Sequence, residues 1–392
     1  MAADVIILGA GAAGMLCAAT AAGRGRRVVV IDHADRPGRK LLITGGGRCN
    51  FANRNEGADH YLSANPRFAV SALRRFPTAD IVAMFERYGI PHSADATGCL
   101  FGPERGGALI AGALEAECRK SGVEFRLSTP VKGVVHAAGQ FTVRAGAEQI
   151  TAPSLVVATG GPAWPQCGAT GIGYDIARQF GLAVIPPRPG LVPLVYRPDD
   201  RRRFRDLAGI TVAVEVACGA HRFRGPLLFT HEGLSGPAGL NAGSCLEPGM
   251  TITIDLIPGV DLATHLAAFR AEQPRAALLT ALIRLLPRRI AQSLTGLEGD
   301  GPTVSETGRT AVAAVRRALK EWSVFPEGTA GYASAEVTMG GVDTAAVSSR
   351  TFEVSSVPGL HFIGEVLDVT GHLGGYNLMW AWASGHCAGM HL

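Results

Sequence analysis

The residues with the clearest chemistry are three glycines near the N-terminus, Gly9, Gly11 and Gly14, spaced as GxGxxG. They follow the unbroken apolar run VIIL and open an alanine-rich stretch that favours helix. The first glycine permits a tight turn, the second lets a pyrophosphate approach the main chain, and the third allows close helix packing. The N–H groups of the first helical residues, Ala12 and Ala13, would then face the phosphates. The pattern predicts a dinucleotide site.

An acidic residue stands where the ribose of a dinucleotide would need it. Asp32 follows a second apolar run, VVVI, after Gly14. A carboxylate at the end of the second strand accepts hydrogen bonds from ribose hydroxyls. NAD and FAD both use this strand, turn, helix, strand and acid unit, so the rest of the chain has to distinguish them.

The segment that follows the acid favours FAD. Residues 38–50 read GRKLLITGGGRCN. The cations of Arg39 and Lys40, and the bare main-chain amides around Gly45, suit a long ligand with a doubly charged pyrophosphate.

The C-terminal region offers a second feature typical of FAD sites. Residues 364–368 read GEVLD at a predicted strand end, where an acidic group can bind ribityl hydroxyls. Residues 371–377 open a helix, whose N-terminus stabilises negative charge on a reduced flavin. Gly160 lies in a further turn at the carboxyl end of a buried apolar run, where open α/β sheets place ligands.

Flavin chemistry also needs a proton donor, and three side chains are candidates. His372 and Tyr376 flank the C-terminal glycine loop, and shaping that loop is the alternative role of both. His231 lies in the middle of the chain before a predicted helix, where its segment could cover the site; helix capping by Ser235 is the alternative. Cys49 has no second thiol a few residues away, as paired-cysteine reductases require, so we expect it to be a packed core residue.

Four longer motifs resemble the BaiN/YhiN-like flavoproteins, which are also described as aminoacetone-oxidase-like FAD-binding enzymes. They are GRKLLITGGGRCNFAN, LLFTHEGLSGPAGL, AEVTMGGV and GEVLDVTGHLGGYN, in the expected order along nearly the whole chain. The resemblance implies an α/β fold: a glutathione-reductase-like FAD-binding Rossmann domain with an inserted β-rich domain that carries a helical insert. By motif position it implies FAD contacts at Ala12, Ala13, Gly14, Asp32, Arg39, Lys40, Gly45, Asp368, Asn377 and Leu378, with Val131 near the adenine.

Two positions depart from the family pattern. Asp32 replaces the glutamate that is commoner in relatives, which preserves a ribose-binding carboxylate, and Met379 stands where glutamine is expected. Among activities, the resemblance implies a reductase that passes hydride from transient NAD(P)H through FAD to an unsaturated, oxo-steroid-like carbonyl substrate. The alternatives are an oxygen-using flavin amine oxidase and, because some tRNA-modifying flavoproteins share this fold, an FAD-dependent RNA-modifying protein.

The order of predicted elements places these motifs in a discontinuous domain. Residues 1–188 and 336–392 would form the FAD-binding domain, and residues 189–335 the inserted β-rich domain with a helical insert at about 260–322. The prolines between 186 and 198 read as the crossing from the first domain into the second.

Composition limits the partners and the compartment. The net charge is only +4, so a small-molecule substrate is expected and nucleic acid is an unlikely partner. The run Arg201, Arg202, Arg203 and Arg205 is read as a solvated loop. Eight cysteines without CxxC or metal-ligand spacing predict reduced thiols and no metal site, in a cytoplasmic protein. No apolar run reaches the ~20 residues that span a bilayer. The sequence does not indicate an oligomeric state.

Overall fold

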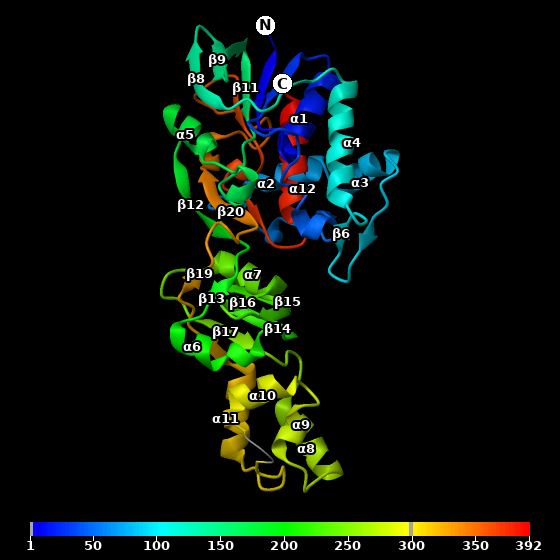
Figure 1. Cartoon of the computed structure of the whole chain (residues 1–392), viewed down its shortest axis with the longest axis vertical. Helices are drawn as coiled ribbons and strands as arrows, with labels where there is room; N and C mark the ends of the chain where they lie inside the picture. Colours follow the sequence, from blue (N-terminus) through cyan, green and yellow to red (C-terminus); the bar gives the residue numbers. More distant parts are fainter. Residues whose placement is uncertain (1–2, 298–300) are drawn as a thin grey trace. The chain divides into compact units, whose positions relative to one another are not determined.

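The computed structural model describes residues 3–297 and 301–392, which form two compact units. The first unit runs to Pro189 and resumes over Glu336–Leu392, and the second is Gly190–Ala335. Each unit has its own cluster of buried apolar side chains. Figure 1 shows the chain coloured along its sequence.

A parallel sheet forms the centre of the first unit. Its strand order is β21-β11-β1-β2-β7, and all four neighbouring pairs are parallel. The sequences VIIL and VVVI of the two central strands are buried at every position, as expected for strands covered on both faces. This confirms the predicted α/β Rossmann architecture. The strands are β1 (Val5–Leu8), β2 (Val28–Ile31), β7 (Glu124–Arg126), β11 (Ser154–Val157) and β21 (Leu360–Phe362).

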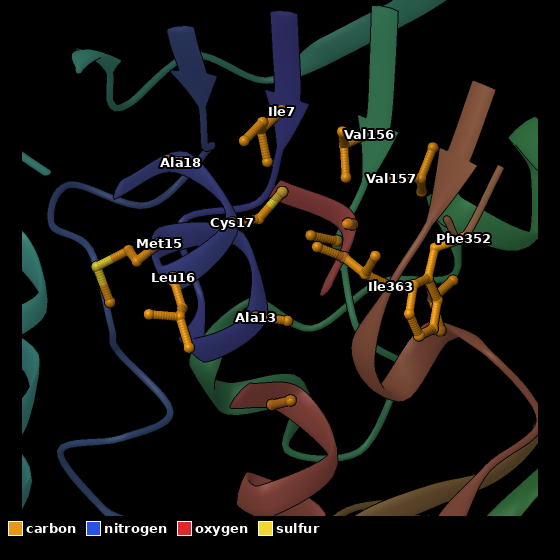
Figure 2. Packing of buried hydrophobic residues seen from close by; sticks show 14 of the residues in the cluster. Ile7, Ala13, Met15, Leu16, Cys17, Ala18, Val156, Val157, Phe352 and Ile363 are labelled. Carbon is orange, nitrogen blue, oxygen red and sulfur yellow. The ribbon is translucent and has the colours of Figure 1, made fainter. Parts of the chain in front are cut away.

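Two helices from opposite ends of the chain pack against each other. These are α1 (Ala12–Gly23) and α12 (Tyr376–Gly389). A Cβ added at Gly385 would overlap the carbonyl oxygen of Ala13, and one at Gly389 would lie 2.8 Å from that of Cys17. Glycines spaced by one helical turn on α12 therefore let the two backbones approach closely. Figure 2 shows side chains of α1 in one apolar cluster with side chains of the sheet.

Smaller elements complete the first unit. Three of the prolines predicted to mark the crossing, Pro186, Pro187 and Pro189, lie in a strand, β12 (Val184–Gly190), of a two-stranded sheet with β20 (Val337–Val342), and the second unit begins at Gly190. An edge strand tolerates prolines because its outer N–H groups need no ladder partner. The other elements are β3 (Asn50–Asn53), β4 (Tyr61–Leu62), β5 (Ser93–Ala94), β6 (Cys99–Phe101), β8 (Val131–Ala137), β9 (Gln140–Ala145), β10 (Glu148–Ala152), β22 (Thr370–Gly371), α2 (Phe68–Arg75), α3 (Thr78–Arg87), α4 (Gly106–Lys120), α5 (Ile172–Gln179) and the short helices η1 (Thr44–Gly47), η2 (Ala58–His60), η3 (Pro165–Cys167), η5 (Thr344–Ala346) and η6 (Gly364–Val366).

The second unit is built on a seven-stranded sheet with the order β18-β17-β14-β15-β16-β13-β19, whose neighbouring strands are antiparallel. Strand β14 alternates buried and less buried residues, the pattern of a sheet with one face packed on a core. Its elements are β13 (Leu194–Val195), β14 (Thr211–Cys218), β15 (His221–Phe229), β16 (Gly233–Ser235), β17 (Ile252–Asp255), β18 (Trp322–Val324), β19 (Gly328–Thr329), α6 (Pro198–Arg203), η4 (Arg205–Leu207), α7 (Gly236–Cys245), α8 (Leu262–Glu272), α9 (Leu278–Leu282), α10 (Arg288–Thr295) and α11 (Arg309–Lys320).

Among residues 3–297 and 301–392, no helix has the length and apolar character needed to cross a bilayer.

Candidate dinucleotide site

The predicted glycine and acid positions meet at one edge of the parallel sheet. Gly9, Asp32 and Gly160 follow the carboxyl ends of β1, β2 and β11, and Gly364 follows that of β21. Because these strands are parallel and adjacent, their carboxyl ends lie on the same side of the sheet. This edge therefore collects loops from the beginning, middle and end of the chain.

The three glycines of the first turn are required for different reasons. Gly9 has φ +106°, and an added Cβ would lie 2.5 Å from the carbonyl oxygen of Ala158. An added Cβ on Gly14 would overlap the carbonyl oxygen of Gly9. Gly11 has an ordinary φ of −81°, and a Cβ there would meet nothing within 4 Å. The packing of the chain therefore explains Gly9 and Gly14 but not Gly11, which fits a ligand lying against the main chain.

Asp32 is anchored by the same turn. Its Oδ2 accepts a hydrogen bond of 2.6 Å from the N–H of Ala10, and Oδ1 accepts one of 2.8 Å from that of Ala34. The N–H of Thr129 donates to the main-chain oxygen of Asp32. That bond holds the segment leading to Val131, at the start of β8, close to the acid. The arrangement is consistent with the predicted ribose and adenine contacts.

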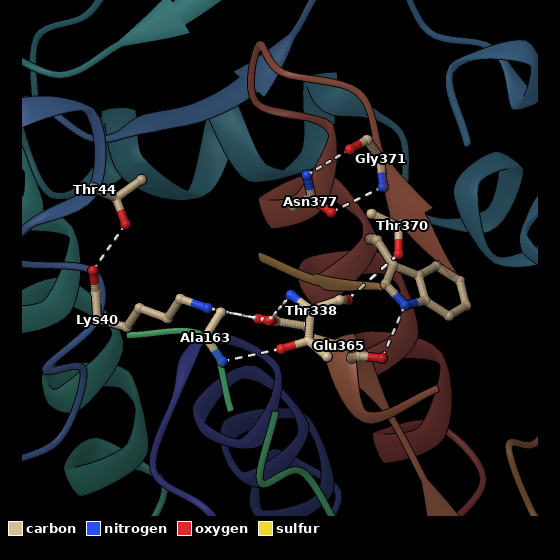
Figure 3. Close-up of polar contacts among 10 residues, drawn as sticks. Lys40, Thr44, Ala163, Thr338, Glu365, Thr370, Gly371 and Asn377 are labelled. Carbon is tan, nitrogen blue, oxygen red and sulfur yellow. Dashed lines mark hydrogen bonds and ion pairs between the residues drawn. The ribbon is translucent and has the colours of Figure 1, made fainter. Parts of the chain in front are cut away.

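Lys40 forms a contact that the sequence did not predict. Its Nζ donates to both carboxylate oxygens of Glu365, at 3.1 and 2.9 Å (Figure 3). The N–H of Thr338 also donates to Glu365, at 2.9 Å, and the Thr338 hydroxyl accepts from the N–H of Ala163. Burial raises the pKa of the nearby Glu336 carboxyl, and Lys40 partly offsets this. Both Glu365 and Thr338 lie inside the family motifs, and that was the one signal that pointed to them.

The loop around η1 exposes main-chain groups. Gly45, Gly46 and Gly47 all have positive φ, at 59°, 65° and 88°, a conformation that favours glycine. Gly45 and Arg39 are exposed. Successive residues with positive φ can direct their N–H groups toward one point and so form an anion-binding concavity.

The side chains of two predicted FAD contacts, Asp368 and Asn377, form hydrogen bonds to other residues of the protein. Asp368 is 6% exposed, and its Oδ2 accepts from the N–H of Ala64 at 2.8 Å; burial raises the pKa of its carboxyl. The Asn377 amide bonds to both the N–H and the carbonyl of Gly371, each at 2.8 Å (Figure 3). Asn377 thus closes the glycine loop, and its main-chain N–H, like that of Leu378, lies in the first turn of α12.

The starts of α1 and α12 are offset along a common direction. Ala13, the second residue of α1, is level with Gly385, the tenth residue of α12, and Cys17 is level with Gly389, so the helices run parallel. The offset is about eight residues, or ~12 Å at ~1.5 Å per residue. Neither helix has a side-chain cap at its N-terminus. Two uncapped N-termini separated in this way suit an extended ligand with a pyrophosphate at one and an electron-accepting ring at the other.

An aromatic cluster surrounds the start of α12. The His60 ring stacks on Tyr376, with ring centres 4.3 Å apart, and meets the His372 ring edge-on at 6.0 Å. The Tyr376 hydroxyl donates to the Asn55 carbonyl at 3.1 Å, and burial raises the pKa of the phenol to about 12. Burial lowers the pKa of His60. His60 belongs to no glycine motif, and no signal in the sequence could have identified it.

The remaining candidates are His231 and Cys49. His231 belongs to the second unit, where it is exposed in the turn between β15 and β16. Cys49 is fully buried, and burial raises the pKa of its thiol to about 12. The thiol is therefore protonated near neutral pH.

Comparison with known proteins gives a family and several relatives. The family described as "HI0933-like protein Rossmann domain" matches residues 3–391. A protein named ribosomal RNA dihydrouridine synthase from Escherichia coli (strain K12) is 45% identical over 384 residues, covering 97% of this chain and 96% of the relative. One of the same name from Haemophilus influenzae is 41% identical over 395 residues, covering 99% and 98%. The 3-dehydro-bile acid delta(4,6)-reductase of Clostridium scindens is 29% identical over 401 residues, covering 98% and 97%.

A solved structure supports the fold alone. The 3-ketosteroid-delta4-(5alpha)-dehydrogenase of Rhodococcus jostii is similar to this chain with a TM-score of 0.50 and 14% identity. The match covers 100% of this chain and 96% of that one.

These matches correct two expectations. An oxo-steroid-like substrate agrees only with the relative at 29% identity, whereas relatives at 45% and 41% are named for ribosomal RNA. The expectation that nucleic acid is an unlikely partner was wrong for the same reason. It rested on the net charge, which sums over the whole molecule and does not report how charges are distributed on its surface.

Proposed function

Because the chain belongs to the HI0933-like Rossmann family of FAD-binding flavoprotein enzymes, we propose that it reduces uridine in ribosomal RNA to dihydrouridine. The observation that carries this proposal is the 45% identity to a ribosomal RNA dihydrouridine synthase over nearly the full length of both chains. A second relative of that name, at 41%, supports it.

The reaction adds one hydride and one proton across the C5=C6 bond of uracil. The C4 carbonyl is conjugated with that bond, so the hydride goes to C6 and the proton to C5. NAD(P)H is the proposed hydride source, and each turnover oxidises one NAD(P)H to NAD(P)⁺ and takes up one proton. Bound FAD supplies hydride acceptance and donation, which no amino-acid side chain offers.

We propose that the chain's own groups hold FAD in the space between the N-terminus of α1 and the N-terminus of α12. The N–H groups of Ala12 and Ala13 would bind the pyrophosphate, and Asp32 the adenosine ribose. At the other end, the N–H groups of Asn377 and Leu378 would face the electron-accepting ring, where the helix N-terminus stabilises negative charge. Gly11, where an added Cβ would meet no atom of residues 3–297 and 301–392 within 4 Å, supports this placement.

The Lys40–Glu365 pair is proposed to lie between these ends. A Cβ added at Gly160 would lie 3.9 Å from Glu365 Oε2. The carboxylate therefore faces the turn after β11, where a ribityl chain would pass. We assign the ribityl hydroxyls to Glu365 in preference to Asp368, because the Asp368 carboxylate is buried against Ala64 and Ser63.

His372 is the proposed proton donor to C5. His372 has intermediate exposure in the glycine loop, although its ring Nε2 is buried, and its main-chain N–H donates to the His60 carbonyl at 2.8 Å, which fixes the start of the loop. Tyr376 is 6% exposed with its hydroxyl committed to Asn55, which favours a positioning role. His231, in the second unit, stays a second candidate for the donor.

The function is tested with ribosomal RNA from an Escherichia coli strain that lacks the K12 relative. The purified protein is incubated with this RNA and NADPH or NADH, and the RNA is digested to nucleosides for mass spectrometry. We expect a nucleoside two hydrogens heavier than uridine, at one RNA position, only when protein and nicotinamide are both present. RNA that stays unmodified with either nicotinamide would contradict the proposal. A ribosomal RNA substrate also agrees with the cytoplasmic location expected from the cysteines.

A further inference from the structure

Two helices of the second unit carry an excess of positive charge. Helix α10 has the sequence RRIAQSLT and α11 the sequence RTAVAAVRRALK, so neither contains an acidic residue. Both bury an apolar face: Ile290, Ala291 and Leu294 on α10, and Val315 and Leu319 on α11. Their exposed arginines point away from these faces. We call them the α10–α11 arginine surface: Arg288, Arg289, Arg309 and Arg317.

A fifth arginine joins this surface. Arg203, at the end of α6, donates from Nη2 to the main-chain oxygen of Ser293 on α10, at 3.4 Å. Ser293 lies one turn after Arg289, so Arg203 and Arg289 lie on the same side of the helix. The neighbours of Arg203 in the basic run are instead paired, Arg201 with Glu232 and Arg202 with Asp199.

These arginines have no carboxylate partner within residues 3–297 and 301–392. Arg316 and Lys320 on α11, by contrast, pair with Glu321 and Asp255. Arg288 and Arg309 moreover occupy the first position of their helices, where the helix dipole makes a positive side chain unfavourable. Folding stability therefore does not account for these charges.

The residues between the arginines indicate the kind of partner. Apart from Arg316, which pairs with Glu321, the exposed positions of α11 between Arg309 and Arg317 are small: Thr310, Ala311, Ala313 and Ala314. No large apolar side chain is exposed on either helix. A protein partner would normally meet an aromatic or aliphatic anchor at the centre of its interface. Unpaired arginines on a smooth surface of small residues suit a chain of phosphates instead.

We infer that the α10–α11 arginine surface binds the phosphate backbone of the RNA substrate. This inference rests on the proposed function and deepens it, because it assigns backbone binding to the helical insert of the second unit. Phosphate contacts fix the position of an RNA without reading its sequence. The surface is thus expected to control RNA affinity without taking part in the chemical step.

The test compares two double variants of the full-length protein loaded with FAD. Arg288→Ala/Arg289→Ala removes two charges from the surface. Arg222→Ala/Arg224→Ala removes two charges from β15 in the same unit, where both arginines face the Glu215 carboxylate. Binding of a fluorescein-labelled RNA hairpin of mixed sequence is measured over a range of KCl concentrations. Bound FAD and the thermal midpoint are measured for each variant to verify folding.

We expect the Arg288/Arg289 variant to bind the hairpin on the order of tenfold more weakly at ~0.1 M salt. The slope of log affinity against log salt should fall by about one to two, and the control should match the wild type. With ribosomal RNA as substrate, KM should rise and kcat stay near the wild-type value. Affinity and slope equal to the wild type would overturn the inference and leave an acidic protein as the partner of this surface.

The two proposals fail in different ways. If the wild type forms dihydrouridine and the Arg288/Arg289 variant binds RNA like the wild type, the surface is wrongly assigned and the proposed function stands. If the wild type forms no dihydrouridine but the variant loses RNA affinity and salt dependence, the proposed function fails and the surface stands.

Discussion

Lys40 and Glu365, 325 residues apart in the sequence, are joined by two hydrogen bonds of 3.1 and 2.9 Å. This pair links the loop after β2 to η6, the short helix that follows the last strand of the parallel sheet. It shows that the two segments from which the sequence predicted a flavin site lie together in the folded chain. The pair is partly exposed, at 36% for Lys40 and 22% for Glu365, so its contribution to folding stability is expected to be small.

The first prediction concerns this pair. Replacing Lys40 with alanine frees the Glu365 carboxylate beside the proposed ribityl chain, and its uncompensated charge should weaken FAD binding by about tenfold, or ~1.4 kcal/mol. The Kd is measured by titrating FAD-free protein with FAD. Lys320→Ala is the matched control, because Lys320 also lies 2.9 Å from a carboxylate, that of Asp255 in the second unit. Equal Kd values in the two variants would show that the Lys40–Glu365 pair does not belong to the FAD site.

The second prediction compares Gly11, which we expect to matter for FAD binding, with Gly14, which we expect to matter for folding stability. Gly11→Ala should weaken FAD binding at least about tenfold, while the free energy of unfolding of the FAD-free protein changes by under ~1 kcal/mol, because the new methyl would meet no described residue within 4 Å. Gly14→Ala should destabilise the FAD-free protein by ~2–3 kcal/mol or more, because its methyl overlaps Gly9. Chemical denaturation and FAD titration measure both quantities. A Gly11→Ala protein that binds FAD normally would place the ligand away from this turn.

Acidification should destabilise the protein through buried histidines. His361 is 4% exposed, and burial lowers the pKa of its imidazole. Its folded pKa therefore lies below the unfolded value of ~6.5. As the pH falls through ~6.5, the unfolded chain takes up a proton that the folded state resists, so the free energy of unfolding decreases. His60 and His386, whose pKa values are also lowered by burial, act in the same direction.

This pH dependence is measured by denaturant unfolding between about pH 5 and 8, and His361→Asn is the informative variant. The asparagine amide retains a donor for the Thr351 carbonyl, which lies 3.1 Å from His361 Nδ1. It does not titrate in this range, so the variant should lose less stability on acidification than the wild type. Parallel curves for the two proteins would show that His361 is not a source of the effect.

The proposed proton donor has its own test. His372→Asn should slow dihydrouridine formation by about 10²-fold or more, the usual range for a lost general acid, while NAD(P)H still reduces the flavin at the wild-type rate. Tyr376→Phe keeps the ring that stacks on His60 and removes only the hydrogen bond to Asn55, so its effect should be smaller. Single-turnover measurements resolve the two steps. A larger loss of the rate of dihydrouridine formation in Tyr376→Phe than in His372→Asn would make Tyr376 the proton donor and His372 the positioning residue.

The parts of the site that the sequence predicted are those encoded within short segments. Gly9, Gly11, Gly14 and Asp32 lie in one strand, turn, helix and strand unit, whose spacing alone fixes their geometry. His60 escaped prediction, and Glu365 was not distinguished from Asp368, because the contacts of His60 and Glu365 involve partners distant in the sequence. The motif position of Asn377 was informative, yet only the fold shows that its amide bonds to Gly371.

The substrate class was mispredicted for a related reason. The net charge argued against nucleic acid, and the basic run was read as a solvated loop, because the contact between Arg203 and α10 arises only through folding of the second unit. The prolines marked the crossing into the second unit, which begins at Gly190, but not that three of them belong to β12, since an edge strand accepts residues that a central strand excludes.

The most direct test of the account follows the visible absorbance of the bound flavin without oxygen. The protein is reduced with one equivalent of NAD(P)H and mixed with ribosomal RNA from the Escherichia coli strain that lacks the K12 relative. We predict rapid return of the oxidised flavin spectrum in proportion to the uridine converted, and no return with ribosomal RNA from the parent strain, in which the target is already reduced. A flavin that stays reduced with both RNAs would contradict the assignment of ribosomal RNA as the electron acceptor.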